Sequence, residues 1–162
     1  QDLKVTVNKI KSFVLGGHGD SMVAMLGATE VEGKKLNDLI KKGKITKEKL
    51  DQIVDRTKKG GAEIVKYLEK GSAFYAPAAS GVEMAESYLK DLKKKLPCAV
   101  YLNGEYEAKD IYAGVPVIIG SNGVESIIEI DLTEEEKLNF EKSIKAVKEL
   151  FDVAKKIDSS LS

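Results

Sequence analysis

Two Asn-Gly pairs interrupt the apolar runs in the second half of the chain. The pair at residues 103–104 follows the apolar run 98–102, and the pair at 122–123 separates the run 115–119 from the run 124–132. An Asn-Gly pair between apolar runs is a strong short-range signal for a β-hairpin, because both residues tolerate the positive φ angles of a type I′ turn. The spacing therefore predicts an antiparallel meander.

A capping box opens the last predicted helix. Thr133 is followed three residues later by Glu136, and such a pair satisfies backbone donors at a helix N-terminus. Apolar residues then recur at spacings of four and three: Phe140, Ile144, Val147, Phe151 and Ala154. We expect a helix from 134 to about 157, with a stripe that forms core or covers a partner subunit.

Two more helices are expected in the middle of the chain. Thr46 is a suitable N-cap for a helix that two glycines interrupt at residues 60–61. Because the apolar face stays in phase across them, we expect a bend or a close packing contact there rather than a full break. The next helix is predicted over about residues 77–95, with Pro97 as its stop signal. Extended pieces before these helices, over 10–15 and 22–31, complete an α+β pattern. Because βαβαβ alternation is missing from the pattern, a doubly wound parallel sheet is not expected.

The only histidine of the chain lies among glycines after a short apolar run. Residues 13–15 are Phe-Val-Leu, and residues 16–20 are Gly-Gly-His-Gly-Asp. An unperturbed imidazole has a pKa of about 6.5, so it exchanges protons near neutral pH. The glycines remove side chains around the ring, which leaves space for a small molecule. The motif predicts a proton-transfer group at the mouth of a strand, and an ordinary turn with a surface histidine is the alternative.

Three other motifs are weaker indications of a reactive or binding site. His18 with Asp20 is too sparse a set for a metal site, so no metal is expected. Cys98 could pair with His18 as a nucleophile, but no activating group lies near it in sequence, and an inert thiol in a strand is the preferred interpretation. The loop with Ser72 and Ala73 is either a pocket wall or a connector.

Composition excludes several classes of protein. The formal net charge is +0 at pH 7, whereas nucleic-acid proteins and binders of anionic membranes carry basic excess. No apolar stretch approaches the roughly 20 residues of a membrane span, and no secretory signal is recognisable. With one cysteine, no internal disulfide forms, so we expect a cytoplasmic protein. Arg56 is the only arginine, so this chain alone cannot provide paired guanidiniums for an acidic substrate.

Several stretches of the chain resemble a known protein family. Residues 14–23, Val-Leu-Gly-Gly-His-Gly-Asp-Ser-Met-Val, resemble the catalytic histidine segment of the lactate/malate dehydrogenase family. Further stretches agree with that family in order and spacing: residues 60–65, 71–79, 84–91, 112–120 and 123–125. The resemblance covers essentially the whole chain. Within the family, the Gly-Gly-His-Gly-Asp form resembles that of the malate dehydrogenases that are built like lactate dehydrogenases.

The resemblance implies a fold and a reaction. The fold would be that family's C-terminal domain, an antiparallel sheet packed with long helices. The reaction would transfer a hydride between NAD and a 2-hydroxy dicarboxylate, malate, giving the 2-keto acid oxaloacetate, as in the tricarboxylic acid cycle. His18 would be the acid/base group, Ser72 and Ala73 would line the substrate pocket, and Pro77 would pack near the nicotinamide. A homo-oligomer, dimer or tetramer, is also implied.

The resemblance is limited to one half of the family's architecture. Residues 1–162 correspond to the substrate-binding, catalytic C-terminal domain, and the N-terminal NAD-binding Rossmann domain has no counterpart in this sequence. That half supplies the glycine fingerprint, the clamping arginines and the aspartate that pairs with the histidine. The isolated chain is therefore expected to be inactive. Lactate dehydrogenase and a non-catalytic assembly module stay open as alternatives.

Overall fold

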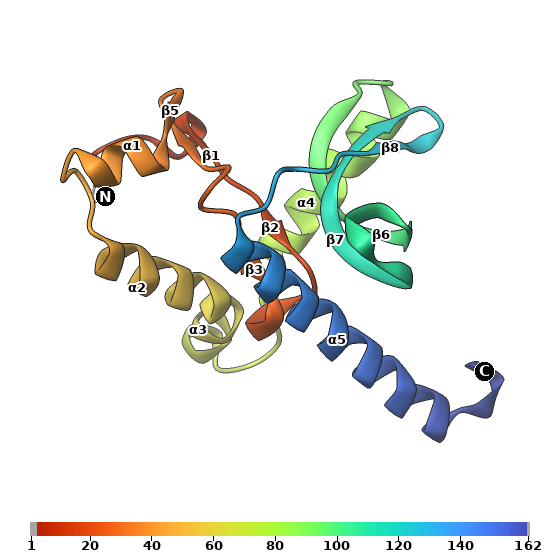
Figure 1. Cartoon of the computed structure of the whole chain (residues 1–162). Coiled ribbons are helices and arrows are strands. Elements are labelled where there is room, and N and C mark those ends of the chain that lie inside the picture. Colours follow the sequence, from red (N-terminus) through yellow and green to blue (C-terminus); the bar gives the residue numbers. More distant parts are fainter. Residues whose placement is uncertain (1–2, 162) are drawn as a thin grey trace.

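Three long antiparallel strands form one sheet in the order β6-β7-β8. They are β6 (Lys94–Asn103), β7 (Lys109–Gly120) and β8 (Gly123–Ile127), coloured green to cyan in Figure 1. The computed structural model describes residues 3–161 of the chain. The antiparallel meander and the α+β class predicted from the sequence are confirmed.

The two Asn-Gly pairs take part in different connections. Gly120 pairs with Gly123, so residues 121–122 form the two-residue turn and Gly123 takes a φ of 86°. The connection between β6 and β7 is longer than a two-residue turn, because a 3-10 turn, η3 (Glu105–Glu107), lies between the strands. Both Asn-Gly pairs therefore lie at hairpin connections, as predicted, but neither pair forms the two-residue turn itself. The tight turn of the second hairpin is displaced by one residue, to 121–122, and Asn122 does not take a positive φ.

The last helix agrees with its prediction. Helix α5 (Glu134–Ile157) is 24 residues long. The Thr133 hydroxyl accepts the N–H of Glu136 at 3.3 Å, and the Glu136 carboxylate accepts the N–H of Thr133 at 2.9 Å. The capping box is confirmed, because both of its reciprocal bonds are present.

The predicted bend at residues 60–61 divides two helices, α2 (Lys47–Lys58) and α3 (Gly60–Leu68). The Thr46 hydroxyl caps α2 by accepting the N–H of Lys49 at 3.2 Å. An added Cβ at either glycine of the bend meets no atom within 4 Å. The glycines therefore serve the bend rather than a close packing contact.

Helix α4 (Tyr75–Leu89) begins earlier and ends well before the predicted limits of 77–95. The predicted stop signal at Pro97 is wrong, because Pro97 lies inside β6 opposite Pro116. β6 is an edge strand of the sheet, and an edge position tolerates a residue that has no N–H to donate. The turn after α4 instead uses Asp91 and Lys93, with φ angles of 50° and 51°.

The first third of the chain contains pairs of short strands where longer extended pieces are expected. β2 (Val14–Leu15) pairs with β3 (Val23–Ala24), and a second small sheet has the order β1-β4-β5. The strands of that second sheet are β1 (Ile10–Lys11), β4 (Glu30–Val31) and β5 (Lys34–Lys35). The remaining short elements are η1 (Val7–Lys9), η2 (Gly19–Ser21), α1 (Leu36–Lys41) and η4 (Ser159–Leu161).

The main core lies between β7, the β2-β3 hairpin and the first half of α5. Alternate residues of β7 are buried: Ile111, Ala113, Val115, Val117 and Ile119. Leu15 and Met25 reach this core from the hairpin, and Phe140 and Ile144 reach it from α5. The hairpin that leads to the histidine turn is thus held by the same core that fixes α5.

Helix α5 is buried only in part. Phe140 is 2% exposed, whereas Phe151, on the same predicted stripe, is 47% exposed. Figure 1 shows the second half of the helix extending away from the sheet and the other helices. The apolar stripe therefore packs into the core in the first half of the helix and is exposed in the second half.

Candidate active site

The turn that carries His18 is fixed to the sheet by its backbone. The Gly16 N–H donates to the Gly114 carbonyl at 2.9 Å, and the Gly114 N–H donates back to Gly16 at 2.8 Å. This antiparallel bridge uses an edge of β7 that β8 no longer covers, because the ladder with β8 ends at Val117. Gly16 is thereby a continuation of the main sheet.

Helix α5 fixes the next residue of the turn. The Gly17 N–H donates to the Ser143 hydroxyl at 2.8 Å. A Cβ added at Gly16 would lie 2.8 Å from the Ser143 Cβ, and one at Gly17 would lie 2.9 Å from Val147 Cγ2. Side chains at these two positions would therefore collide with the helix.

This geometry corrects the role predicted for the glycines. The space at Gly16 and Gly17 is filled by α5 and is not available to a small molecule. Only at Gly19 does an added Cβ meet no atom within 4 Å, and Gly19 takes a φ of 80°. Among the three glycines beside the histidine, open space is thus found only at Gly19, on its C-terminal side.

His18 is exposed and stands at the start of η2 with an extended backbone, φ −77° and ψ 148°. The Met22 N–H donates to the Gly19 carbonyl at 3.1 Å and closes this turn. Within residues 3–161, no hydrogen bond or ion pair engages the His18 side chain. An imidazole on a fixed backbone with both ring nitrogens available is suited to accept or donate a proton.

The other predicted site residues lie at the junction of α3 and α4. Ser72 is exposed and Ala73 is half-buried in the connecting loop, and Pro77 is exposed in the first turn of α4. No hydrogen bond or ion pair between described residues joins them to His18. Their roles at a substrate or cofactor site therefore stay predictions.

Cys98 lies in β6, and its thiol donates to the Met84 sulfur at 3.4 Å. Burial raises the pKa of the Cys98 thiol, which disfavours the nucleophilic thiolate. The inert thiol is therefore the better interpretation of the two.

The single arginine is already paired. Arg56 on α2 forms two parallel bonds to the Glu63 carboxylate on α3, at 3.0 and 2.8 Å. The hydrogen bond to Glu63 raises the pKa of the guanidinium. This fork spans the bend between the two helices, so Arg56 is engaged in a surface pair.

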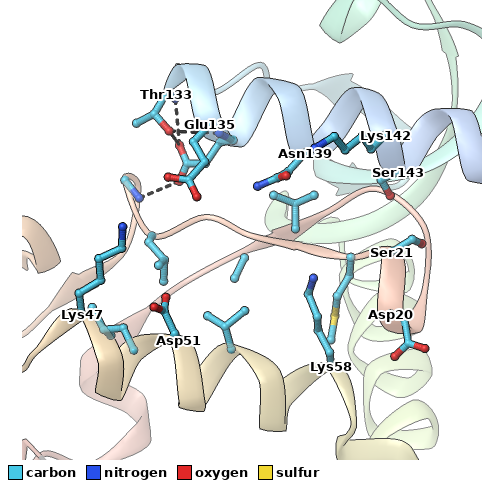
Figure 2. A pocket seen from close by; sticks show the side chains of 18 of the residues that line it. Asp20, Ser21, Lys47, Asp51, Lys58, Thr133, Glu135, Asn139, Lys142 and Ser143 are labelled. Atoms are coloured by element: carbon cyan, nitrogen blue, oxygen red, sulfur yellow. Dashed lines mark hydrogen bonds between the residues drawn. The ribbon is translucent and has the colours of Figure 1, made fainter.

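A cavity of about 570 Å³ lies between the η2 turn, α2 and α5. Figure 2 shows its polar rim, with Lys47, Asp51 and Lys58 on α2 facing Glu135, Asn139 and Lys142 on α5. Asp20 and Ser21, which follow His18, line its end together with Ser143. None of the four predicted site residues lines this cavity. The cavity therefore borders the histidine turn without containing the imidazole.

The described part of the chain contains neither a metal-binding cluster nor a helix that could span a membrane. Among residues 3–161, no three His, Cys, Asp or Glu side chains come together as a metal-binding group. No helix in that range combines the length and apolar character that crossing a bilayer requires.

Comparison with known proteins places the chain in a family. The sequence profile of the lactate/malate dehydrogenase alpha/beta C-terminal domain matches residues 1–157. The malate dehydrogenase of Pelagibacter ubique is 63% identical over 161 residues, which make up 99% of this chain and 50% of that protein.

Solved structures agree with the sequence relatives. The crystal structure of malate dehydrogenase from Cryptosporidium parvum is 43% identical with a TM-score of 0.89, over 92% of this chain and 48% of that one. Lactate dehydrogenase from Eimeria maxima, crystallised with NADH and oxamate, is 41% identical with a TM-score of 0.93, over 98% of this chain and 48% of that one.

The chain thus spans about half the length of these relatives, and the match runs through the histidine turn, the sheet and the terminal helix. The fold of this chain matches the corresponding half of the two solved structures over 92% and 98% of its residues. The chain belongs to the lactate/malate dehydrogenase family and comprises that family's alpha/beta C-terminal domain.

Proposed function

We propose that this chain is the substrate-side, C-terminal half of an NAD-dependent malate dehydrogenase, which interconverts malate and oxaloacetate. Family membership and the 63% identity to a malate dehydrogenase support this reaction. The observation that carries the proposal is the exposed imidazole of His18, held on a backbone that is fixed to both β7 and α5.

His18 is the acid/base group of the proposed reaction. When malate is oxidised, an imidazole nitrogen accepts the proton of the C2 hydroxyl as the C–H bond at C2 breaks and its electron pair leaves as hydride. In the reverse direction, the protonated ring donates a hydrogen bond to the carbonyl of oxaloacetate and then delivers its proton. General acid–base catalysis of this kind contributes about 10²–10⁴-fold in rate.

Ser72, Ala73 and Pro77 supply one wall of the proposed site. NAD, when bound, accepts the hydride. Pro77 fits the nicotinamide side because it presents an exposed apolar ring in the first turn of α4. Ser72 and Ala73 precede that turn and would contact the substrate.

Most of the binding machinery lies outside this chain. Its one arginine is already paired with Glu63, so no free guanidinium is present to grip a dicarboxylate. His18, Ser72 and Pro77 are all exposed, so these residues alone do not enclose a substrate. We propose that an N-terminal Rossmann domain supplies the NAD site and the carboxylate clamp in the intact protein.

Lactate dehydrogenase is the second candidate. The TM-score of 0.93 with a lactate dehydrogenase shows that the fold of this domain does not separate the two activities. The higher identity to a curated malate dehydrogenase favours malate.

A substrate comparison with the intact protein distinguishes the two. NADH oxidation is measured with oxaloacetate and with pyruvate under the same conditions, and kcat/KM is compared. The proposal expects oxaloacetate to be preferred by at least about 100-fold, a difference of about 2.7 kcal/mol in transition-state binding. A preference for pyruvate would assign lactate dehydrogenase, and inactivity with both would contradict the proposed reaction.

A further inference from the structure

We propose that Ser143 is a positioning residue for His18: its hydroxyl holds the histidine turn against α5 in the orientation that proton transfer requires. The inference rests on the proposed function of His18. Ser143 acts on the reaction only through the backbone of the turn, by its hydrogen bond to Gly17.

Ser143 is buried at the contact between α5 and the turn. It is 2% exposed, and its Oγ accepts the Gly17 N–H at 2.8 Å. Among the described residues, no other side chain hydrogen-bonds to the backbone of residues 16–18. Figure 2 shows Ser143 on α5 beside Ser21 on the η2 turn, at the end of the cavity. The bond therefore joins the helix directly to the residue before His18.

The bond matters because, within residues 3–161, it is the only hydrogen bond between α5 and the histidine turn. Gly16 is held by β7, but Gly17 has no side chain and a wide range of accessible backbone angles. Without the Ser143 hydroxyl, the Gly17 N–H loses its acceptor and the peptide before His18 can rotate. A shift of about 1 Å in a reacting group can cost up to about 10²-fold in rate.

The chain offers a matched control in Ser87. Ser87 on α4 is 0% exposed, its hydroxyl donates to the Ile119 carbonyl at 2.7 Å, and it accepts the Lys94 N–H at 3.2 Å. It is thus a second buried serine that joins a helix to other backbone, but it contacts no part of the histidine turn. Ser87→Ala reports what the loss of a buried serine does to stability alone.

The test measures kcat and KM for malate in the intact protein, with hydrogen exchange of the segment 16–18 as an activity-independent readout. For Ser143→Ala we expect kcat to fall about tenfold with KM changed less than about twofold, and faster exchange at Gly17. Ser143→Thr should retain most of the wild-type kcat. Threonine keeps the hydroxyl that accepts the Gly17 N–H. Ser87→Ala should lower the melting temperature but leave kcat unchanged.

Three results would overturn the inference. The first is a wild-type kcat in Ser143→Ala. The second is an equal loss of kcat in Ser87→Ala, which would make the effect one of general stability. The third is an inactive wild-type protein with both malate and lactate, which rejects the proposed function and this inference together. An active wild type with a normal Ser143→Ala variant rejects the inference alone.

Discussion

At the scale of single residues, the histidine turn is shaped by a neighbouring helix. Gly16 combines a φ of 90° with direct contact to Ser143, whereas Gly33 has a φ of 73° and open space around an added Cβ. The two positions share the backbone requirement and differ in packing. Comparing alanine variants at the two positions therefore separates two free-energy costs: that of a left-handed backbone at a non-glycine residue, and that of a steric clash with α5.

Gly16→Ala should therefore destabilise the protein more than Gly33→Ala. The left-handed backbone costs about 1–2 kcal/mol at either position, and overpacking against α5 adds about 1–3 kcal/mol at Gly16 only. Urea unfolding of the two variants measures the difference. Equal free energies of unfolding would show that α5 shifts to accommodate a methyl group at position 16 without cost.

Sequence and structure differ in what they reveal about this turn. His18 at the end of a strand could be predicted, because the apolar run and the glycines are adjacent in sequence. Ser143 could not, because 126 positions separate it from Gly17 and the helical stripe is recognised only by its apolar members. A small polar residue three positions after Phe140, on the face of that stripe, is the one signal that points to it.

At the scale of elements, one carboxylate joins the start of α5 to the loop between β3 and β4. Glu136 is 7% exposed, and beyond its capping bonds to Thr133 it accepts the Gly27 N–H at 2.9 Å. Glu135, its neighbour in the same first turn, is exposed. Comparing variants of Glu136 and Glu135 therefore separates the stability due to the bond with Gly27 from the stability that any acidic residue adds at a helix N-terminus.

Glu136→Ala should cost about 2–4 kcal/mol, because backbone donors at Thr133 and Gly27 lose a charged acceptor. Glu135→Ala should cost less than about 1 kcal/mol, since it removes only the favourable interaction with the helix dipole. Chemical denaturation at pH 7 checks both values. Similar costs for the two variants would mean that the bond to Gly27 adds no stability.

The success of the sequence predictions at this scale depends on how local each signal is. The capping box and bounds of α5 were predictable, because Thr133 and Glu136 are three residues apart. The end of α4 was not, because an edge strand accommodates Pro97. Helix α1 escapes prediction because it has only six residues and its N-cap, Lys35, makes no side-chain capping bond.

At the scale of the whole molecule, the chain exposes more surface than a compact protein of its size. Its accessible area is 11409 Å², whereas roughly 7,900 Å² is typical of a compact monomer of 17.7 kDa. Part of the excess is an apolar stripe on α4. Tyr75, Val82 and Leu89, seven residues apart on one helical face, are 77%, 68% and 78% exposed. We propose that a second copy of the protein covers this stripe in a homo-oligomer.

Leu89→Glu should shift the intact protein towards the monomer, because a carboxylate in an apolar interface loses its hydration without gaining a partner. Val7→Glu, at a position that is 86% exposed in η1, is the matched control and should leave the assembly unchanged. Sedimentation velocity measures the mass of each variant. An unchanged mass for Leu89→Glu would place the oligomer interface elsewhere or exclude it.

The isolated 162-residue chain should be catalytically inactive, because its sole arginine is engaged with Glu63 and NAD is proposed to bind a Rossmann domain that is not among these residues. Assay of the purified chain with oxaloacetate and NADH tests this expectation. Turnover at the rate of the intact protein would show that the domain is sufficient by itself.

The most direct test of the central claim compares the intact protein with its His18→Asn variant in malate-dependent NADH formation. Because the His18 side chain is exposed and makes no hydrogen bond to any residue in the range 3–161, the variant should keep the wild-type melting temperature. The account predicts that kcat/KM falls by about 10³-fold, as expected for the loss of a general acid–base group. A well-folded variant with kcat/KM within about threefold of the wild type would show that His18 is not the proton-transfer group.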